Sequence, residues 1–450
     1  MTQGSDAFSR RAVMAGSIGL AAAVASSTAA ADASPARSAR RKALPKGFLW
    51  GTATAAHQIE GNNSNADFWL AENVKPTLFA EPSLDACDSY HRYEEDIALA
   101  ARLGFNAHRF GIEWARIEPE PGKFSMAELD HYLRVLETCH AHGLAPIVTY
   151  SHWTVPRWFA ARGGFEQADS PDLFARFAEK ATARLGPLIA AASTFNEANI
   201  ARIVRARPDA KALEPLVRAM LAACARASGS DRFASVLFAD IDKSEANMVA
   251  AHERAFAAMK AGPGDFPVGV TVSMQAIEGV GGSIEVTHKA EAVAAQLYGP
   301  WIDQAAKSDF VGVQTYTRVR VGPDGVLPPP NGAELTAAGY EYYPEALAHT
   351  IRYAAAKTGK PVYVTENGIA TNDDTRRIAY IDSALAGVRA CLDEGIDVRG
   401  YIHWSLLDNF EWVFGYKQKF GLVAVDRTTF KRTPKPSAVH LGRRARANLV

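Results

Sequence analysis

The chain has little cysteine, and the spacing of what it has excludes common metal and redox sites. Four cysteines occur in 450 residues, namely Cys87, Cys139, Cys224 and Cys391. They show no C-x-x-C spacing and have no nearby pair of histidines, which argues against a zinc site or a thiol redox centre. We expect buried free thiols, since cysteine commonly packs as a small apolar side chain, and a disulfide among them is the alternative.

Net charge is also absent. The 49 lysines and arginines are balanced by 49 aspartates and glutamates, so no overall field attracts nucleic acid, an anionic membrane or a polyanionic substrate. No G-x-G-x-x-G motif joins a strand to a helix, and no G-x-x-x-x-G-K-[ST] motif occurs, which argues against dinucleotide and phosphate-loop sites. A neutral small-molecule ligand therefore fits this composition better than a charged one.

The first 33 residues have the pattern of an export signal. They contain the pair Arg10-Arg11, an apolar run of alanine, glycine and valine, and the A-x-A site Ala31-Asp32-Ala33, in the order found in secretory signals. The arginine pair favours the twin-arginine route, which predicts a periplasmic or extracellular protein of a bacterium. The alternative is an uncleaved membrane anchor, but the run is short and rich in alanine and glycine for a bilayer span. Residues 34–44 form a basic linker, and we expect one folded domain over 45–450.

Eight short apolar segments alternate with helical patterns along this domain. The segments are FLWGTATA, NAHRFGI, APIVTY, STFNE, VGVTVS, FVGVQTY, VYVTENG and VRGYIHWS. The stretches between them, such as 93–104 and 128–143, repeat apolar residues with the helical period. Continuous apolar strands are typical of sheets covered on both faces, and eight strand–helix units predict a single (β/α)₈ TIM barrel. A doubly wound open sheet is the alternative, which the missing glycine motif disfavours.

Polar side chains stand at the predicted carboxyl ends of the strands, where a barrel of this kind has its active site. They bring amide, imidazole, guanidinium, phenol, carboxylate and indole groups together: Gln58, Arg109, His152, Asn196, Glu197, Tyr316, Glu366, Trp404, Glu411 and Trp412. Sugar hydroxyls need such polar partners, and the C–H faces of a pyranose pack on aromatic rings. The sequence therefore predicts a carbohydrate site at the mouth of the barrel.

Glu197 and Glu366 are the candidate catalytic pair. In a retaining glycosidase one carboxylate attacks the anomeric carbon, and a second, about 5 Å away, protonates the leaving oxygen and later activates water. We expect Arg109 and Tyr316 to keep Glu366 ionised, and the charge of Glu366 to raise the pKa of Glu197. Chemistry between two glutamates implies no metal and no organic cofactor.

From FLWGTATAAHQIEG to RTPKPSA, nearly the whole mature chain resembles the β-glucosidases and β-galactosidases of glycoside hydrolase family 1. TENG is similar to the nucleophile segment of that family, TFNEAN to its acid/base segment, and HRFGIEWARIEP to the segment that carries an arginine beside the nucleophile. The resemblance implies that Glu366 is the nucleophile, supported by Arg109 and Tyr316, that Glu197 is the acid/base, and that Asn196 donates to the sugar 2-hydroxyl. It also implies that the walls of the subsite for the non-reducing sugar are Gln58, His152, Trp404, Glu411 and Trp412.

The chain departs from this family pattern at several positions. Ala198 replaces a usual proline, which predicts a looser turn after the acid/base residue. Gln314 stands where the family commonly has asparagine, so it must reach further or reshape the pocket, and His108 replaces a usual tyrosine. Residues 201–220 are unlike the usual tryptophan-bearing wall of the leaving-group site. These departures leave Glu197 and Glu366 in place, and the identity of the aglycone stays open.

The expected function is hydrolysis of β-D-glucosides from the non-reducing end. Galactosides and fucosides stay open, because glucose and galactose differ at one hydroxyl near Gln58, Glu411 and Trp412. A phosphosugar substrate is disfavoured, since Glu411 would repel a 6-phosphate. Two other functions stay open on the same barrel: a transglycosidase, and a non-catalytic sugar-binding protein, which the presence of both Glu197 and Glu366 disfavours.

Overall fold

The computed structural model of the protein describes residues 44–450. The predicted export signal over 1–33, and all of the 34–44 linker but its last residue, lie outside the described residues. Within residues 44–450 no helix is long and apolar enough to cross a membrane. The four cysteines are buried free thiols, which confirms the first expectation for them.

A closed barrel of parallel strands forms the centre of the fold, and it confirms the predicted TIM barrel. Around the barrel the strands follow the order β1-β11-β10-β7-β5-β4-β3-β2, which is chain order once the small additional strands are set aside. Closure excludes the open-sheet alternative. The strands are β1 (Leu49–Ala53), β2 (Ala107–Gly111), β3 (Ala145–Ser151), β4 (Ala191–Phe195), β5 (Val268–Ser273), β7 (Phe310–Thr315), β10 (Val362–Asn367) and β11 (Val398–Trp404).

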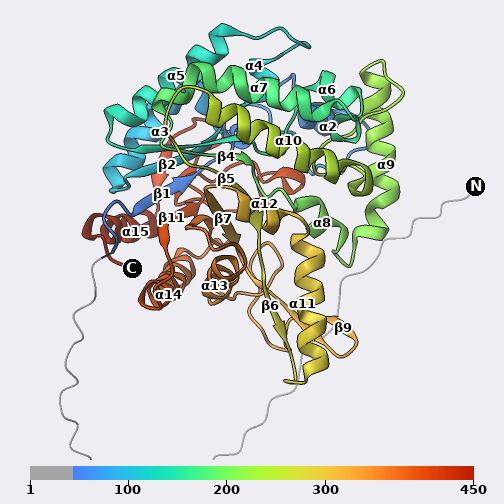
Figure 1. Ribbon diagram of the computed structural model, residues 1–450. Coiled ribbons are helices and arrows are strands. Elements are labelled where there is room, and N and C mark those ends of the chain that lie inside the picture. The colour runs from blue at the N-terminus through green and yellow to red at the C-terminus, as the bar shows by residue number, and fades with distance from the viewer. Residues whose placement is uncertain (1–43) are drawn as a thin grey trace, which may run out of the picture. The chain divides into compact units, whose positions relative to one another are not determined.

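One major helix follows each barrel strand and packs on the outside of the barrel (Figure 1). The two helices expected over 93–104 and 128–143 are present and begin a few residues earlier than predicted. Gly104 ends the first of them with a φ of +111°, a conformation that glycine adopts without steric cost. The helices are α3 (Ser89–Leu103), α5 (Met126–Ala141), α7 (Ser170–Leu185), α10 (Ile241–Ala261), α12 (Trp301–Lys307), α13 (Ala346–Thr358), α14 (Asp374–Asp393) and α15 (Pro436–Ala447).

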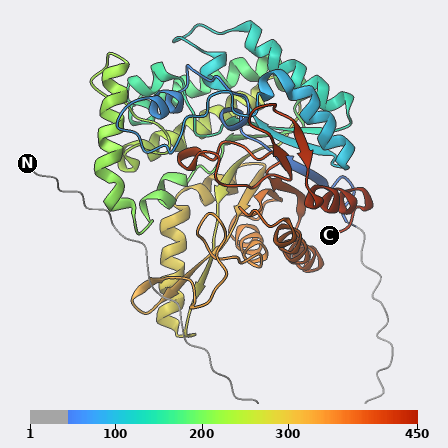
Figure 2. The same cartoon turned by 180° about the vertical axis from the view of Figure 1, so that it is seen from behind.

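Additional elements are inserted in the loops of the barrel. Figures 1 and 2 show α11 with the strands β6 and β9 projecting from one side of the barrel. The strands β6, β8 and β9 form a three-stranded sheet, and β12 and β13 form a two-stranded one. The inserted elements are α1 (Ala56–Ile59), α2 (Asp67–Asn73), α4 (Trp114–Ile117), α6 (Arg157–Ala161), α8 (Ile200–Arg205), α9 (Ala210–Ala227), β6 (Ala276–Gly279), α11 (Ile284–Tyr298), β8 (Arg318–Gly322), β9 (Gly325–Leu327), β12 (Val423–Val425) and β13 (Arg432–Pro434).

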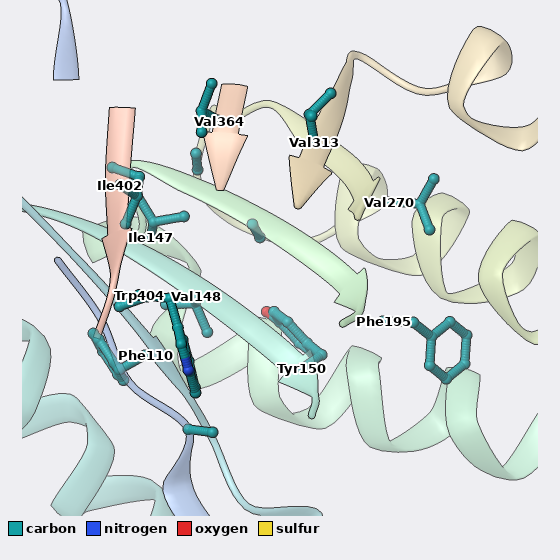
Figure 3. Close-up of a cluster of buried hydrophobic side chains, with 14 of the residues drawn as sticks. Phe110, Ile147, Val148, Tyr150, Phe195, Val270, Val313, Val364, Ile402 and Trp404 are labelled. Carbon is teal, nitrogen blue, oxygen red and sulfur yellow. The ribbon is translucent and has the colours of Figure 1, made fainter. Parts of the chain in front are cut away.

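β-branched side chains of the barrel strands are buried throughout. Figure 3 shows Val270, Val313, Val364 and Ile402, each from a different strand. All four are fully buried, and Val313 pairs in register with Val364 on the neighbouring strand. Packing of such side chains on a pleated sheet explains why these segments form strands. It also gives the polar residues at the strand ends a rigid support.

A buried ion pair ties the C-terminal segment to the barrel helices. Arg432 on β13 donates through Nε and Nη2 to the two carboxylate oxygens of Asp96 on α3, at 2.7 and 3.0 Å. Arg432→Met is expected to lower the free energy of unfolding by about 3–5 kcal/mol, because it leaves the buried carboxylate without its cation and with only the Ser89 hydroxyl as a side-chain donor. Urea unfolding measures this. Arg399→Met is the matched control, since Arg399 and Asp397 are both half exposed and their pair contributes at most about 1 kcal/mol. Equal losses in the two variants would contradict the prediction.

Candidate active site

Glu366 lies at the carboxyl end of β10, and both of its carboxylate oxygens are held. Arg109 donates from Nη1 to Oε1 at 2.6 Å, and the hydroxyl of Tyr316 donates to Oε2 at 2.6 Å. The Glu366 residue is only 3% exposed. Burial raises the pKa of Glu366, while the charge of Arg109 and the Tyr316 hydrogen bond act in the opposite direction. The structure thus brings together the three residues that the sequence placed at one site.

Glu197 follows β4 and points a second buried carboxyl group into the same mouth. Burial, together with the nearby negative charge of Glu366, raises the pKa of Glu197 to about 8. Its backbone has a φ of +42°, in the left-handed region that costs a non-glycine residue about 1 kcal/mol or more. Its N–H donates to Thr271 Oγ1 at 3.0 Å and to Gln314 Oε1 at 3.2 Å, which holds that conformation.

The turn after Glu197 is not loosened by the missing proline. The N–H of Ala198 donates to the carbonyl oxygen of Thr271 at 3.0 Å. Proline has no N–H and could not form this bond. The expectation of a looser turn is therefore wrong, because alanine adds a hydrogen bond that ties the turn to β5.

The side-chain amide of Asn196 shares Arg109 with Glu366 and is oriented by two donors. Its Oδ1 accepts from Arg109 Nη2 at 2.5 Å and from Gln314 Nε2 at 2.8 Å. Its Nδ2 is buried and has no hydrogen-bond partner among residues 44–450. A buried donor without a partner is costly, so this NH₂ group is available for an oxygen of a ligand.

Gln58 and Glu411 meet on the other side of the mouth. Nε2 of Gln58 donates to Asn409 Oδ1 at 3.1 Å, to the carbonyl of Phe410 at 2.7 Å and to Glu411 Oε2 at 3.3 Å. Oε1 of Gln58 is buried and accepts no hydrogen bond from the described part of the chain. Burial and the charge of Glu366 raise the pKa of Glu411 to about 8, against the hydrogen bond from Gln58. These groups offer a second set of partners for hydroxyls.

Aromatic rings form the floor of the site. The imidazole of His152 stacks on Trp404 and on Trp412, with ring centroids 5.6 and 5.9 Å apart. Burial and the charge of Arg109 hold the pKa of His152 well below its usual value, so the ring is neutral. Its Nδ1 is buried and has no partner within residues 44–450. Flat rings beside unpartnered polar atoms match the two faces of a sugar.

Three further residues belong to the site and were absent from the predicted set. Trp153 packs on Trp412 at 4.7 Å and donates from Nε1 to the carbonyl of Asn196 at 3.2 Å. Gln314 stood in the sequence at a strand end near the expected mouth and as a departure from the family, but it was given no role in the site. Tyr340 lies near enough to the mouth that, after burial, the charges of Glu411 and Glu197 raise the pKa of its phenol. Tyr340 lies in the long segment between β9 and α13, which has no periodic pattern that could have placed it.

Metal-binding groups do not gather in the described part of the chain. Within residues 44–450, no group of three or more histidine, cysteine, aspartate or glutamate side chains could hold a metal ion. Burial raises the pKa of the thiols of Cys87 and Cys139 to about 12, so both stay protonated at neutral pH. The barrel mouth thus presents three carboxyl groups, all with raised pKa values. Of these, Glu366 is the one that the Arg109 guanidinium holds.

The family model for glycosyl hydrolase family 1 matches the chain over residues 40–310 and 239–448. These two overlapping ranges cover nearly the whole folded part. The chain therefore belongs to glycosyl hydrolase family 1, a family of glycoside hydrolases.

Individual relatives agree with this assignment. The thermostable beta-glucosidase B of Thermobispora bispora is 30% identical, over 88% of this chain and 89% of its own length. The apo structure of a beta-glucosidase 1317 is 51% identical, with a TM-score of 0.86 over 90% of this chain and 99% of its own. The beta-glucosidase of Thermotoga maritima in complex with glucoimidazole is 27% identical, with a TM-score of 0.78 over 91% of this chain and 100% of its own.

Proposed function

We propose that this protein is a retaining exo-β-glycosidase that hydrolyses β-D-glucosides. The observation that carries the proposal is the difference between the two buried glutamates. Glu366 is bound by Arg109 and Tyr316 on both oxygens, whereas Glu197 has a pKa of about 8 and keeps its proton at neutral pH. One group is thus equipped as a nucleophile and the other as a general acid. The beta-glucosidases among the relatives support the same substrate class.

In the first step a carboxylate oxygen of Glu366 attacks the anomeric carbon as the bond from that carbon to the leaving oxygen breaks. Glu197 gives its proton to the leaving oxygen, and the products are an alcohol and a glycosyl ester of Glu366. In the second step Glu197, now a carboxylate, takes a proton from water as the water oxygen attacks the same carbon. The ester bond breaks, Glu366 leaves as a carboxylate, and two inversions restore the β configuration.

The unpartnered polar atoms of the site suggest how the sugar is held. Asn196 Nδ2, Gln58 Oε1 and His152 Nδ1 each lack a partner in the described structure and are buried, so sugar hydroxyls would satisfy them. The rings of Trp404 and Trp412 offer apolar faces to the pyranose. The pKa of about 8 leaves Glu411 mostly protonated at neutral pH, so its charge repels a 6-phosphate less strongly than the sequence alone implied.

Export remains part of the proposal. The pair Arg10-Arg11 and the apolar run that follows it are the features that support a twin-arginine signal, periplasmic or extracellular location, and cleavage near residue 33. The catalytic proposal does not depend on export.

Hydrolysis of p-nitrophenyl β-D-glucoside, galactoside and fucoside, followed by proton NMR of the first sugar released, tests the function. We expect the glucoside to be cleaved and β-glucose to appear before α-glucose. Early α-glucose would contradict the retaining mechanism. Transfer of the sugar to an added alcohol with little free glucose would instead favour a transglycosidase, and binding without cleavage of any of the three would favour a sugar-binding protein.

The pH dependence of kcat/KM should reflect the raised pKa of Glu197. The proton is present below that pKa, which is about 8, and is lost above it, so the rate is expected to fall as the pH rises through about 8. On the acid side the rate falls as Glu366 takes up a proton. Because Glu411 also has a pKa of about 8, profiles of Glu197→Gln and Glu411→Gln separate the two groups. The prediction fails if the alkaline decline is unchanged in Glu197→Gln and is lost in Glu411→Gln.

A further inference from the structure

We infer that Gln314 is a positioning residue that sets the orientation of the Asn196 amide and so controls how well the enzyme uses the 2-hydroxyl of its substrate. This inference rests on the proposed function. Gln314 lies on β7, is fully buried, and pairs in register with Glu366 on β10 and with Ser273 on β5. It therefore occupies the barrel wall directly beside the nucleophile.

The Gln314 amide bridges two consecutive residues of the acid/base segment. Its Oε1 accepts from the backbone N–H of Glu197 at 3.2 Å, and its Nε2 donates to Asn196 Oδ1 at 2.8 Å. The backbone N–H can only donate, so the oxygen of Gln314 must face Glu197 and its NH₂ group must face Asn196. The hydrogen-bond network thus determines which way round this amide lies.

The same reasoning then applies to Asn196. A second group that can only donate, Nη2 of Arg109, lies 2.5 Å from the same Oδ1. Two donors on the oxygen force the NH₂ group of Asn196 to the opposite side, where it is buried without a partner in residues 44–450. If the amide were reversed, its NH₂ group would face both donors and two hydrogen bonds would be lost.

The side-chain length of Gln314 is what allows the bridge. An asparagine at this position would be shorter by one C–C bond, about 1.5 Å, and could not keep both hydrogen bonds at their present distances without a backbone shift. The expectation that Gln314 must reach further is met by this geometry. Arg109 still contacts Asn196 Oδ1 when Gln314 is changed, so the expected loss is partial.

A substrate without the 2-hydroxyl shows whether the Asn196 donor acts on that group. Hydrogen bonds to the 2-hydroxyl of a glycoside strengthen in the transition state, so poor positioning of the Asn196 donor should affect only substrates that carry this group. Gln314→Met removes both hydrogen bonds and keeps a long unbranched side chain. Thr271 Oγ1 still accepts from the N–H of Glu197 at 3.0 Å, so the acid/base residue keeps its backbone position. We expect kcat/KM for p-nitrophenyl β-D-glucoside to fall by about 10- to 50-fold, and that for the 2-deoxyglucoside by less than about 3-fold.

A double-mutant cycle gives a second readout. In an Asn196→Ala background, Gln314→Met should lower the rate on the glucoside by less than about 3-fold, because the donor that it orients is already gone. Gln304→Met on helix α12 is the matched control, since Gln304 is also a buried glutamine but lies outside the barrel mouth. Gln304→Met should leave kcat/KM unchanged for the glucoside and for the 2-deoxyglucoside.

The outcomes separate this inference from the proposed function. Equal losses on the glucoside and the 2-deoxyglucoside, or no loss on either, would overturn the role of Gln314. If Gln314→Met does not fold, as judged by its thermal melting curve, Gln314→Asn is tested in its place with the same expected selectivity. Failure of the wild-type protein to cleave either substrate with retention would overturn the proposed function itself.

Discussion

Replacement of Glu366 by alanine is expected to lower kcat/KM on p-nitrophenyl β-D-glucoside by about 10⁴-fold or more. The variant would lack the group that we propose as the nucleophile, and water cannot take its place on that face of the sugar while Glu197 is protonated. The cavity left by the side chain would still be lined by the guanidinium of Arg109 and the hydroxyl of Tyr316. A small anion could therefore enter it.

Azide provides the decisive measurement on this variant. Azide entering the cavity would attack the anomeric carbon once, so the product should be an α-glucosyl azide of inverted configuration, identified by NMR. Glu137→Ala is a suitable control, because Glu137 is an exposed glutamate on helix α5 and its loss should leave the rate unchanged. Substantial hydrolysis by Glu366→Ala without azide would show that another group is the nucleophile.

Replacement of Glu197 by alanine should give a different kinetic signature. General acid catalysis contributes about 10²–10⁴-fold, and its loss matters most when the leaving group is a poor one. We expect kcat/KM to fall by about 10³-fold for an alkyl β-glucoside and by less than about 10-fold for 2,4-dinitrophenyl β-D-glucoside, whose leaving group needs no proton. The second step would also slow, so KM for the dinitrophenyl substrate should fall.

Azide again distinguishes the roles of the two glutamates. With Glu366 present, azide would attack the glycosyl ester in the second step, and the product should be the β-glucosyl azide of retained configuration. Steady-state kinetics with and without azide, together with NMR of the product, measure this. An equal loss for alkyl and dinitrophenyl substrates would contradict the role of Glu197 as general acid.

The eight barrel strands could be predicted because each is a short, continuous apolar run whose character is local. Segments such as VYVTENG and VRGYIHWS coincide with β10 and β11 to within one residue at either end. These strands alternate with helices along the chain. Few sheet topologies fit this alternation, since parallel strands need crossover connections. Similarly, the polar residues at the strand ends could be assigned to one mouth before any contact between them was known.

The contacts between these site residues could not be predicted from the sequence. Arg109 and Glu366 are 257 positions apart, and Asn196 and Gln314 are 118 apart. Gln314 could be placed at a strand end, but its role could not be predicted, because nothing local to β7 shows that its amide meets Asn196. Tyr340 could not be predicted for the same reason, since it reaches the mouth from a long loop.

The sequence by itself determined the fold class, the family and the identity of the two candidate catalytic glutamates, because strand periodicity and short motifs are properties of neighbouring residues. Only the tertiary structure showed that the pKa values of both glutamates are raised and which way the Asn196 donor points. A pKa depends on burial and on charges from other strands, and the orientation of an amide depends on which donors face it. The pKa values and the amide orientation both depend on distances between residues on different strands. Closure of the sheet into a barrel sets those distances.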